Sequence, residues 1–222
     1  MDHPATVDPS QLFPFGHSQR HTVFLRPLLD EIDPPRANIS VGDYSYYSDF
    51  DDATRFFLRN VRYDFSRSKA RLDIGKFCAF AHDTTFILSD ANHAIVGPST
   101  FPFPIFGGAW AKALSPDETP WANKGNTRIG HDVWCGYKST IMPGVTVGSG
   151  AIVAANAVVS RDVPAYAMVA GNPARVVKMR FDAATVEKLL ALAWWDWPQA
   201  KIAAAVPVLV KGDADALAAL AP

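Results

Sequence analysis

The chain has 222 residues, of which 49% are hydrophobic and 19% are charged, and its formal net charge at pH 7 is −1. This length fits a single domain, and the apolar content excludes an intrinsically disordered chain. A net charge so close to zero argues against nucleic acid or an anionic membrane surface as a partner. Cys78 and Cys135 belong to no CxxC motif, which argues against a disulfide scaffold and a zinc knuckle.

Residues 1–38 are expected to form an N-terminal arm. The arm opens with MDHPATVDPSQLFPF, which has charges and prolines where a signal peptide needs a basic region followed by an apolar run. No window of the chain approaches 18 consecutive apolar residues, so we expect no membrane association. These features predict a cytoplasmic protein.

A repeat of six residues dominates the segment 39–166. Aliphatic or small apolar residues recur at every sixth position, at Ile129, Cys135, Ile141, Val147, Val153 and Val159. Ile74, Phe80 and Phe86 keep the same spacing, and a first partial coil is expected around Val41. A helix repeats every 3.6 residues and a simple strand every two, so neither keeps a six-residue period on one face.

The period predicts an all-β solenoid in which each hexad forms one short flat face. A second small or β-branched series follows the first by four residues, at Val133, Ser139, Val145, Ala151, Ala157 and Val163. Three hexads make one triangular coil, and coils stacked about 4.8 Å apart pile their inward residues into ladders. Two inserted segments, 51–72 and 101–125, break the rhythm and are predicted to leave the solenoid as excursions. Their aromatic content favours docking on another surface.

Residues 167–222 are expected to leave the solenoid through a loop and then to form helices. The loop contains AGNPARVV at 170–177. Asp182 is placed to cap a helix of about three turns, with Val186, Leu189 and Leu190 at helical spacing. The Ala-rich tail after Gly212 predicts a second short helix.

Several longer strings, in order along the chain, resemble the hexapeptide-repeat xenobiotic acetyltransferases, the group that contains streptogramin A (virginiamycin) acetyltransferases and type B chloramphenicol acetyltransferases. The strings are VGDYSYYSD (41–49), IGKFCAFAHDTTFI (74–87), ANH (91–93), FPF (101–103), the hexad tract 129–166, GNPA (171–174) and WWDWP (194–198). The SYYSD, NH with FPF, and WWDW strings are more specific than a generic hexad. The resemblance implies a left-handed parallel β-helix.

The resemblance also implies an enzyme that uses acetyl-CoA and no metal. Members of the family are homotrimers with active sites between subunits, and they acetylate small-molecule acceptors. The histidine of the family's Asn-His motif corresponds to His93, which would act as the general base. An imidazole near neutral pH can take the proton of a hydroxyl and return it to the leaving thiolate.

Further site residues follow from the same resemblance. Tyr46 and Trp134 would contact the acceptor. Alternatively, Tyr46 is an aromatic residue of the core, and Trp134 is a residue of the seam between subunits. The cofactor would contact residues of the late coils and the exit loop, namely Tyr137, Ala155, Ser160, Arg161 and Lys178. For the charged members of this set, an ordinary solvated role is equally open. Cys135 is expected to be a small core residue.

The chain departs from the family beside His93. Relatives commonly follow Asn-His with Arg-Met-Asp-Gly, whereas this chain has Ala94, Ile95, Val96 and Gly97, and the excursion 101–125 adds Trp110 and Trp121. These residues favour a hydrophobic xenobiotic acceptor of the streptogramin A or chloramphenicol type. A sugar or cell-surface glycan is the alternative acceptor, and a non-catalytic trimeric scaffold is a third hypothesis. A metal-dependent hydrase would need histidines converging from stacked coils, which the spacing of His82 and His93 does not supply.

Overall fold

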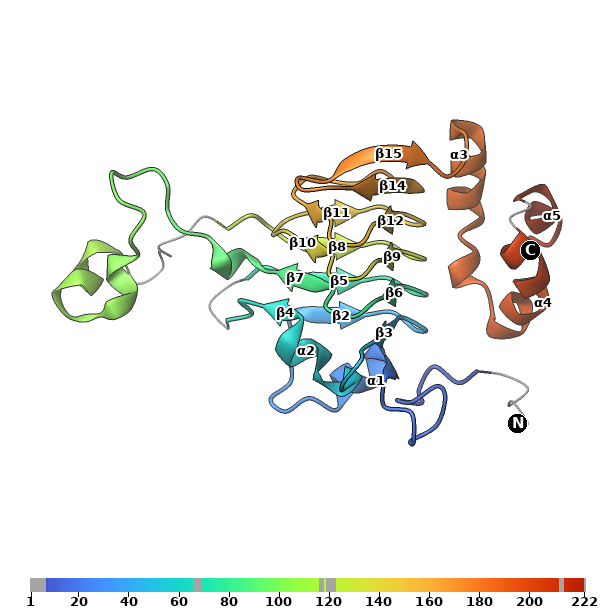
Figure 1. Cartoon of the computed structure of the whole chain (residues 1–222), viewed down its shortest axis with the longest axis horizontal. Helices are drawn as coiled ribbons and strands as arrows, with labels where there is room; N and C mark the ends of the chain where they lie inside the picture. Colours follow the sequence, from blue (N-terminus) through green and yellow to red (C-terminus); the bar gives the residue numbers. More distant parts are fainter. Residues whose placement is uncertain (1–6, 66–68, 116–117, 119–122, 212–213, 222) are drawn as a thin grey trace.

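The protein is a left-handed parallel β-helix with helices packed along one side (Figure 1). The computed structural model describes residues 7–65, 69–115, 118, 123–211 and 214–221. Trp121 lies outside the described residues. Within these ranges, no helix is long and apolar enough to cross a membrane.

Three sheets, here called A, B and C, form the faces of the prism, and each coil contributes one strand to each sheet. Sheet B contains β2 (Ile39–Val41), β5 (Leu72–Ile74), β8 (Thr127–Ile129) and β11 (Thr146–Val147). The parallel strands of sheet A are β3 (Tyr46–Ser48), β6 (Ala79–Phe80), β9 (Trp134–Cys135), β12 (Ile152–Val153) and β14 (Ala167–Ala170). Sheet C contains β4 (Val61–Arg62), β7 (Thr85–Ile87), β10 (Thr140–Ile141) and β13 (Val158–Val159).

The inward ladders form the core in the way that the period predicts. On sheet A the buried ladder is Tyr47, Phe80, Cys135, Val153 and Val169. All six residues of the main series, from Ile129 to Val159, are buried. Each inward side chain packs on its counterpart in the next coil, so the repeat itself supplies the apolar surface that buries it.

Glycines let successive coils approach closely at one corner. A Cβ built on Gly75 would lie 2.4 Å from the carbonyl oxygen of Gly130, and one built on Gly130 would lie 2.5 Å from the backbone nitrogen of Ser149. Backbone atoms cannot move aside at these distances, so a side chain at either position would force the coils apart.

The first excursion is shorter than the expected segment 51–72, because part of that segment belongs to the first coil. Within the segment 51–72, η1 (Ala53–Arg55) and α2 (Phe56–Arg59) lead into β4, which pairs with β7 and completes the first coil. Only about nine residues, between β4 and β5, then separate the coils. The N-terminal arm also has structure of its own, because β1 (Thr22–Phe24) pairs antiparallel with β3 and runs into α1 (Leu25–Asp30).

The exit from the solenoid differs from the expectation as well. The segment 167–170 is still a strand, β14, in parallel register with β12. The next segment folds back as β15 (Arg175–Met179), which pairs antiparallel with β14 and lies at the end of sheet A. Residues that were expected to form a loop therefore extend the prism by part of another coil.

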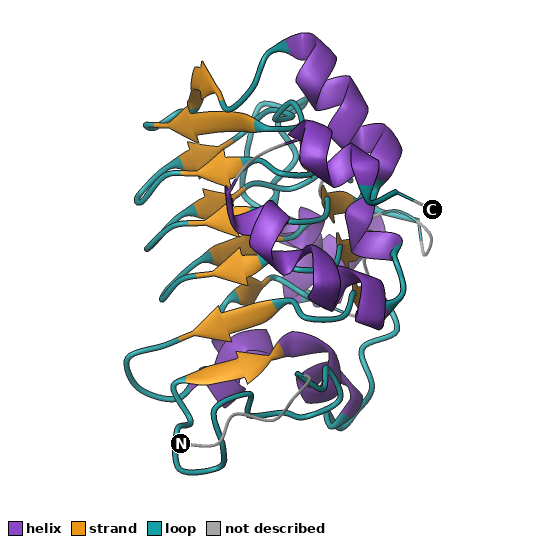
Figure 2. Cartoon of the chain, turned by 90° about the vertical axis from the view of Figure 1, so that its right-hand side faces the viewer, coloured by secondary structure: helices purple, strands orange, loops and turns teal. Residues whose placement is uncertain are grey.

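The C-terminal segment forms three helices beside the prism (Figure 2). In α3 (Ala183–Leu192), the Asp182 carboxylate accepts a hydrogen bond from the Thr185 N–H, as expected for an N-cap. After η5 (Trp194–Asp196) come α4 (Gln199–Lys211), which the sequence reasoning did not anticipate, and α5 (Ala214–Ala219). These helices pack through Trp194, Trp195, Trp197 and Leu189 on the corner between sheets B and A.

Candidate functional site

The second excursion leaves the prism at the corner between sheets C and B. The chain departs after β7 through η2 (Ser89–Ala91), and it returns next to Ser89, whose hydroxyl accepts the Lys124 N–H at 3.1 Å and donates to the Gly125 carbonyl at 3.3 Å. Between these points the segment projects away from the strands, on the side opposite to the C-terminal helices (Figure 1). It contains η3 (Phe103–Phe106) and η4 (Gly108–Ala113).

His93 lies at the start of this excursion with its ring held by the backbone. Its Nδ1 lies 2.8 Å from the carbonyl oxygen of Thr100. Because a carbonyl only accepts, Nδ1 must carry the hydrogen, and Nε2 of the neutral ring keeps its lone pair. The side chain is exposed, so this lone pair is accessible to a reactant.

The surroundings of His93 are apolar and uncovered. Ile95 and Val96 are 80% and 99% exposed. Further along, Phe101, Phe103, Phe106 and Trp110 contact one another, with Phe101 and Phe106 stacked at 5.2 Å between ring centroids. All four rings nevertheless remain exposed. So large an apolar surface on one segment is typical of a place where another surface binds.

Tyr46 and Trp134 lie on one outward ladder of sheet A. Tyr46 pairs with Ala79, and Ala79 pairs with Trp134. The two aromatic residues are therefore two coils apart, about 9.6 Å along the prism, with a small side chain between them. Tyr46 is 37% exposed and Trp134 is 53% exposed, whereas their neighbours Tyr47 and Cys135 point into the core.

Two of the expected cofactor residues occupy the corner between sheets A and C. Tyr137 and Ala155 follow β9 and β12 at equivalent positions of successive coils, and the Tyr137 carbonyl accepts the N–H of Asn156 at 2.8 Å. The Tyr137 ring stacks on His82 at 5.8 Å, and His82 stacks on Phe50 at 4.5 Å. This corner thus presents an aromatic surface beside the small side chain of Ala155.

The other three cofactor residues are divided between two places. Ser160 and Arg161 follow β13 at the corner between sheets C and B, two coils beyond the point where the chain departs towards His93, and both are exposed. Lys178 lies on β15 in register with Met168, and so belongs to the outward ladder of sheet A that carries Trp134.

The expected site residues therefore form two groups on opposite sides of one prism. His93, Ser160 and Arg161 lie at the corner between sheets C and B, and in a triangular prism this corner is opposite sheet A. Tyr46, Trp134 and Lys178 lie on sheet A, with Tyr137 and Ala155 at its edge. Within one chain the core separates the two groups.

Two features of the site were missed from the sequence. The Thr100 carbonyl, which orients His93, is a backbone atom, and no side-chain pattern marks it. Ala79 separates Tyr46 from Trp134 because of the register of sheet A, and the outward hexad phase of all three residues is the signal that would have revealed it.

The two cysteines provide no activated nucleophile. Burial raises the pKa of Cys78 to about 12 and also raises that of Cys135, so neither thiol is activated. Cys135 occupies the core as expected. Among the described residues, no group of three or more His, Cys, Asp or Glu side chains could hold a metal ion.

Comparison with known proteins decides the family. Residues 126–161 match the family model "Bacterial transferase hexapeptide (six repeats)". The chain is 39% identical to a chloramphenicol acetyltransferase of Agrobacterium fabrum over 81% of this chain and 86% of that protein. The chain belongs to the hexapeptide-repeat acetyltransferases.

Another member of this enzyme family and one solved structure extend the comparison. The chain is 38% identical to virginiamycin A acetyltransferase of Staphylococcus aureus over 95% of this chain and 91% of that protein. A hexapeptide-repeat acetyltransferase of Vibrio cholerae, solved as a complex with acetyl coenzyme A, matches with a TM-score of 0.40 and 24% identity over 66% of this chain and 62% of that one.

Proposed function

We propose that this acetyltransferase transfers the acetyl group of acetyl-CoA to a hydroxyl of a hydrophobic xenobiotic of the streptogramin A or chloramphenicol type, with His93 as the general base. The observation that carries the proposal is the exposed His93 ring, whose Nδ1 is held at 2.8 Å by the Thr100 carbonyl. This contact leaves Nε2 as an oriented proton acceptor.

The reaction needs only groups that this chain and its two substrates supply. Nε2 of His93 takes the proton of the acceptor hydroxyl while the hydroxyl oxygen attacks the thioester carbonyl. The C–S bond of the tetrahedral intermediate then breaks, and the imidazolium returns the proton to the CoA thiolate. Holding both reactants together supplies much of the rate, because a bimolecular encounter becomes a reaction within one complex.

The proposed site is shared between two chains of a homotrimer. A seam that places the corner between sheets C and B of one chain against sheet A of its neighbour would bring His93 opposite Tyr46 and Trp134. It would also bring Ser160 and Arg161 towards the cofactor residues of the neighbouring chain, Tyr137, Ala155 and Lys178. The exposed apolar surface of the excursion supports such a seam, since a neighbouring chain would cover it.

The acceptor class follows from the side chains at this seam. Ile95 and Val96 present aliphatic groups beside His93, and Tyr46 and Trp134 flank the small Ala79. A sugar would need several polar side chains, so these walls favour an apolar acceptor with one reactive hydroxyl. The names of the chloramphenicol and virginiamycin A relatives point to the same class.

Replacement of His93 tests the chemistry. We expect His93→Ala to lower kcat by about 10²–10⁴-fold while CoA still binds, and His21→Ala, which removes an exposed histidine of the arm, to leave kcat unchanged. Thiol release is measured with virginiamycin M1, chloramphenicol and a panel of sugars as acceptors. Turnover by His93→Ala near that of the original protein would refute the general base, and turnover of sugars alone would refute the acceptor class.

Mixing two inactive variants tests the shared site. Neither His93→Ala nor Trp134→Ala chains hold a complete site, but a mixed trimer has seams in which one chain supplies His93 and the other supplies Trp134. We therefore expect co-refolded mixtures to exceed both parents in activity. If mixing restores nothing although native mass spectrometry shows mixed trimers, the two residues do not act across a seam.

A further inference from the structure

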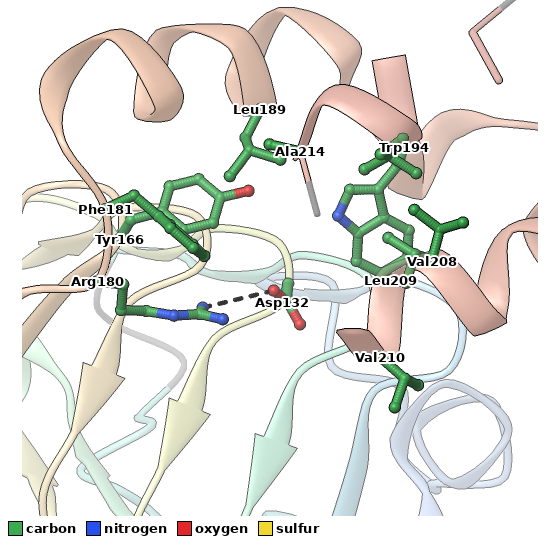
Figure 3. A pocket seen from close by; sticks show the side chains of 11 residues that line it. Asp132, Tyr166, Arg180, Phe181, Leu189, Trp194, Val208, Leu209, Val210 and Ala214 are labelled. Carbon is green, nitrogen blue, oxygen red and sulfur yellow. Dashed lines mark ion pairs between the residues drawn. The ribbon is translucent and has the colours of Figure 1, made fainter. Parts of the chain in front are cut away.

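A cavity of about 240 Å³ lies between the prism and the C-terminal helices (Figure 3). These helices lie on the side of the prism opposite to the excursion (Figure 1). Its polar lining comes from Asp132, Tyr166 and Arg180. Its apolar lining comes from Phe181 and from α3, η5, α4 and α5, which contribute Leu189, Trp194, Leu209 and Leu217 among others. His93 and the expected cofactor residues lie elsewhere, so this cavity is separate from the proposed acetyl-transfer site.

The corner between sheets B and A explains why Tyr166 reaches this cavity. Asp132, Gly150 and Tyr166 occupy equivalent corner positions of three successive coils, all with positive φ. A Cβ on Gly150 would lie 2.3 Å from the Tyr166 ring. The missing side chain at Gly150 therefore lets the ring lie along the corner, in the direction of Asp132.

The Tyr166 hydroxyl is buried without a partner. The residue is 2% exposed, and its hydroxyl oxygen has no hydrogen-bond partner within the described ranges. Burial raises the pKa of this phenol to about 12, so it keeps its proton and can donate. Buried hydroxyls are normally hydrogen-bonded, because an unmade bond costs free energy. In Figure 3 the hydroxyl points into the cavity on the side of Leu189.

The charges at the cavity balance each other. The Arg180 guanidinium donates to the Gly150 carbonyl at 2.5 Å and lies 3.7 Å from the Asp132 carboxylate. It also lies over the Tyr166 ring, 5.3 Å from the ring centroid. Among the lining residues that the structure describes, one cation and one anion leave no net charge to attract an ionic ligand. Asp132 can still accept a hydrogen bond.

We infer that this cavity is a binding site for a small neutral molecule with an apolar body and one hydroxyl group, a simple alcohol or phenol. The hydroxyl of the ligand would accept the unmade hydrogen bond of Tyr166 and donate its own hydrogen to Asp132. The apolar body would lie against Leu189, Trp194 and Leu217. This inference is independent of the proposed acetyl transfer.

Phenol and toluene form a matched pair of probes, because they differ in the hydroxyl group. We expect NMR titrations of the full chain to give an affinity for phenol about tenfold higher than for toluene, the range of one hydrogen bond. Tyr166→Phe keeps the ring over Gly150 and removes the unpaired hydroxyl, so phenol should bind it only as weakly as toluene does. Tyr63→Phe, at an exposed tyrosine outside the cavity, should bind phenol as the original protein does.

Three outcomes would overturn the inference. The absence of any phenol-induced shift in the signals of Leu189 and Leu217 would mean that the cavity holds only water. Equal phenol affinity in the original protein and in Tyr166→Phe would mean that the hydroxyl is not used. Undiminished phenol binding by a folded Ala214→Phe variant, whose new ring fills the cavity, would place the ligand elsewhere.

Discussion

The late coils (126–163) and the second excursion (88–125) both contain many large apolar residues. The coils bury most of these side chains, whereas the excursion leaves most of them exposed. In the coils, each inward side chain is buried against the equivalent residue of the next coil. In the excursion, four aromatic rings contact one another and remain exposed. A repeat provides its own partner surface, whereas a single excursion has no equivalent neighbour within its chain. Apolar residues that lie outside the repeat and remain exposed therefore mark the place where another surface is needed.

The largest expected difference between the coils and the excursion is the loss of stability when an aromatic ring is removed from each. Phe80 is fully buried against Phe56 and Phe86, so Phe80→Ala should lower the free energy of unfolding by about 3–5 kcal/mol. Trp110→Ala, at a ring of the excursion that is exposed within one chain, should change the free energy of unfolding of the single chain by less than about 0.5 kcal/mol but raise KM for the acceptor. Urea denaturation and steady-state kinetics measure the two effects. Equal losses of stability would show that the excursion is packed like the core.

Glycines provide a smaller contrast of the same kind. Gly130→Ala introduces a Cβ 2.5 Å from the backbone of Ser149 and should destabilise the prism by about 1–3 kcal/mol. Gly97→Ala, in the excursion, meets nothing within 4 Å and should change stability by less than about 1 kcal/mol, with stabilisation favoured by the lower entropy of the unfolded chain. Thermal unfolding of both variants measures the two effects. A lower midpoint temperature for Gly97→Ala than for Gly130→Ala would contradict the prediction.

The smallest expected effect is a dependence of stability on pH at the corner that faces the helices. His131 stacks on Trp195 at 5.0 Å, and its Nδ1 accepts the Lys76 N–H at 3.0 Å. Burial lowers the pKa of His131; the Lys76 charge lowers it further, and Asp196 opposes the shift. Below the ordinary value of 6.5 the unfolded chain therefore binds more protons than the folded one, and stability falls as the pH drops.

His131→Asn provides the control, because its amide oxygen can accept the Lys76 N–H but does not titrate. We expect the loss of stability between pH 7.5 and pH 5.5, measured by urea denaturation, to be smaller in this variant than in the original protein. An identical loss in both proteins would assign the pH dependence to other groups.

Part of the candidate site follows from the sequence and part does not. The string around Asn92 and His93 marks the proposed base, and the hexad phase predicts that Trp134 points outward, as it does. The contact between His93 and Thr100 could not be predicted, since it depends on how an irregular segment closes on itself. The strands β4 and β15 and the helix α4 were missed because their residues do not follow the period and are paired or packed by tertiary contacts.

The sequence by itself determined the prism, because a six-residue period places the same kind of residue on the same face of every coil. Only the tertiary structure decided where the excursion leaves, how the C-terminal helices close a cavity over Tyr166, and that His93 and Trp134 lie on opposite sides of one chain. These features depend on which corner of the prism a segment reaches, and corner positions are set by the three-dimensional register of the coils rather than by any local pattern.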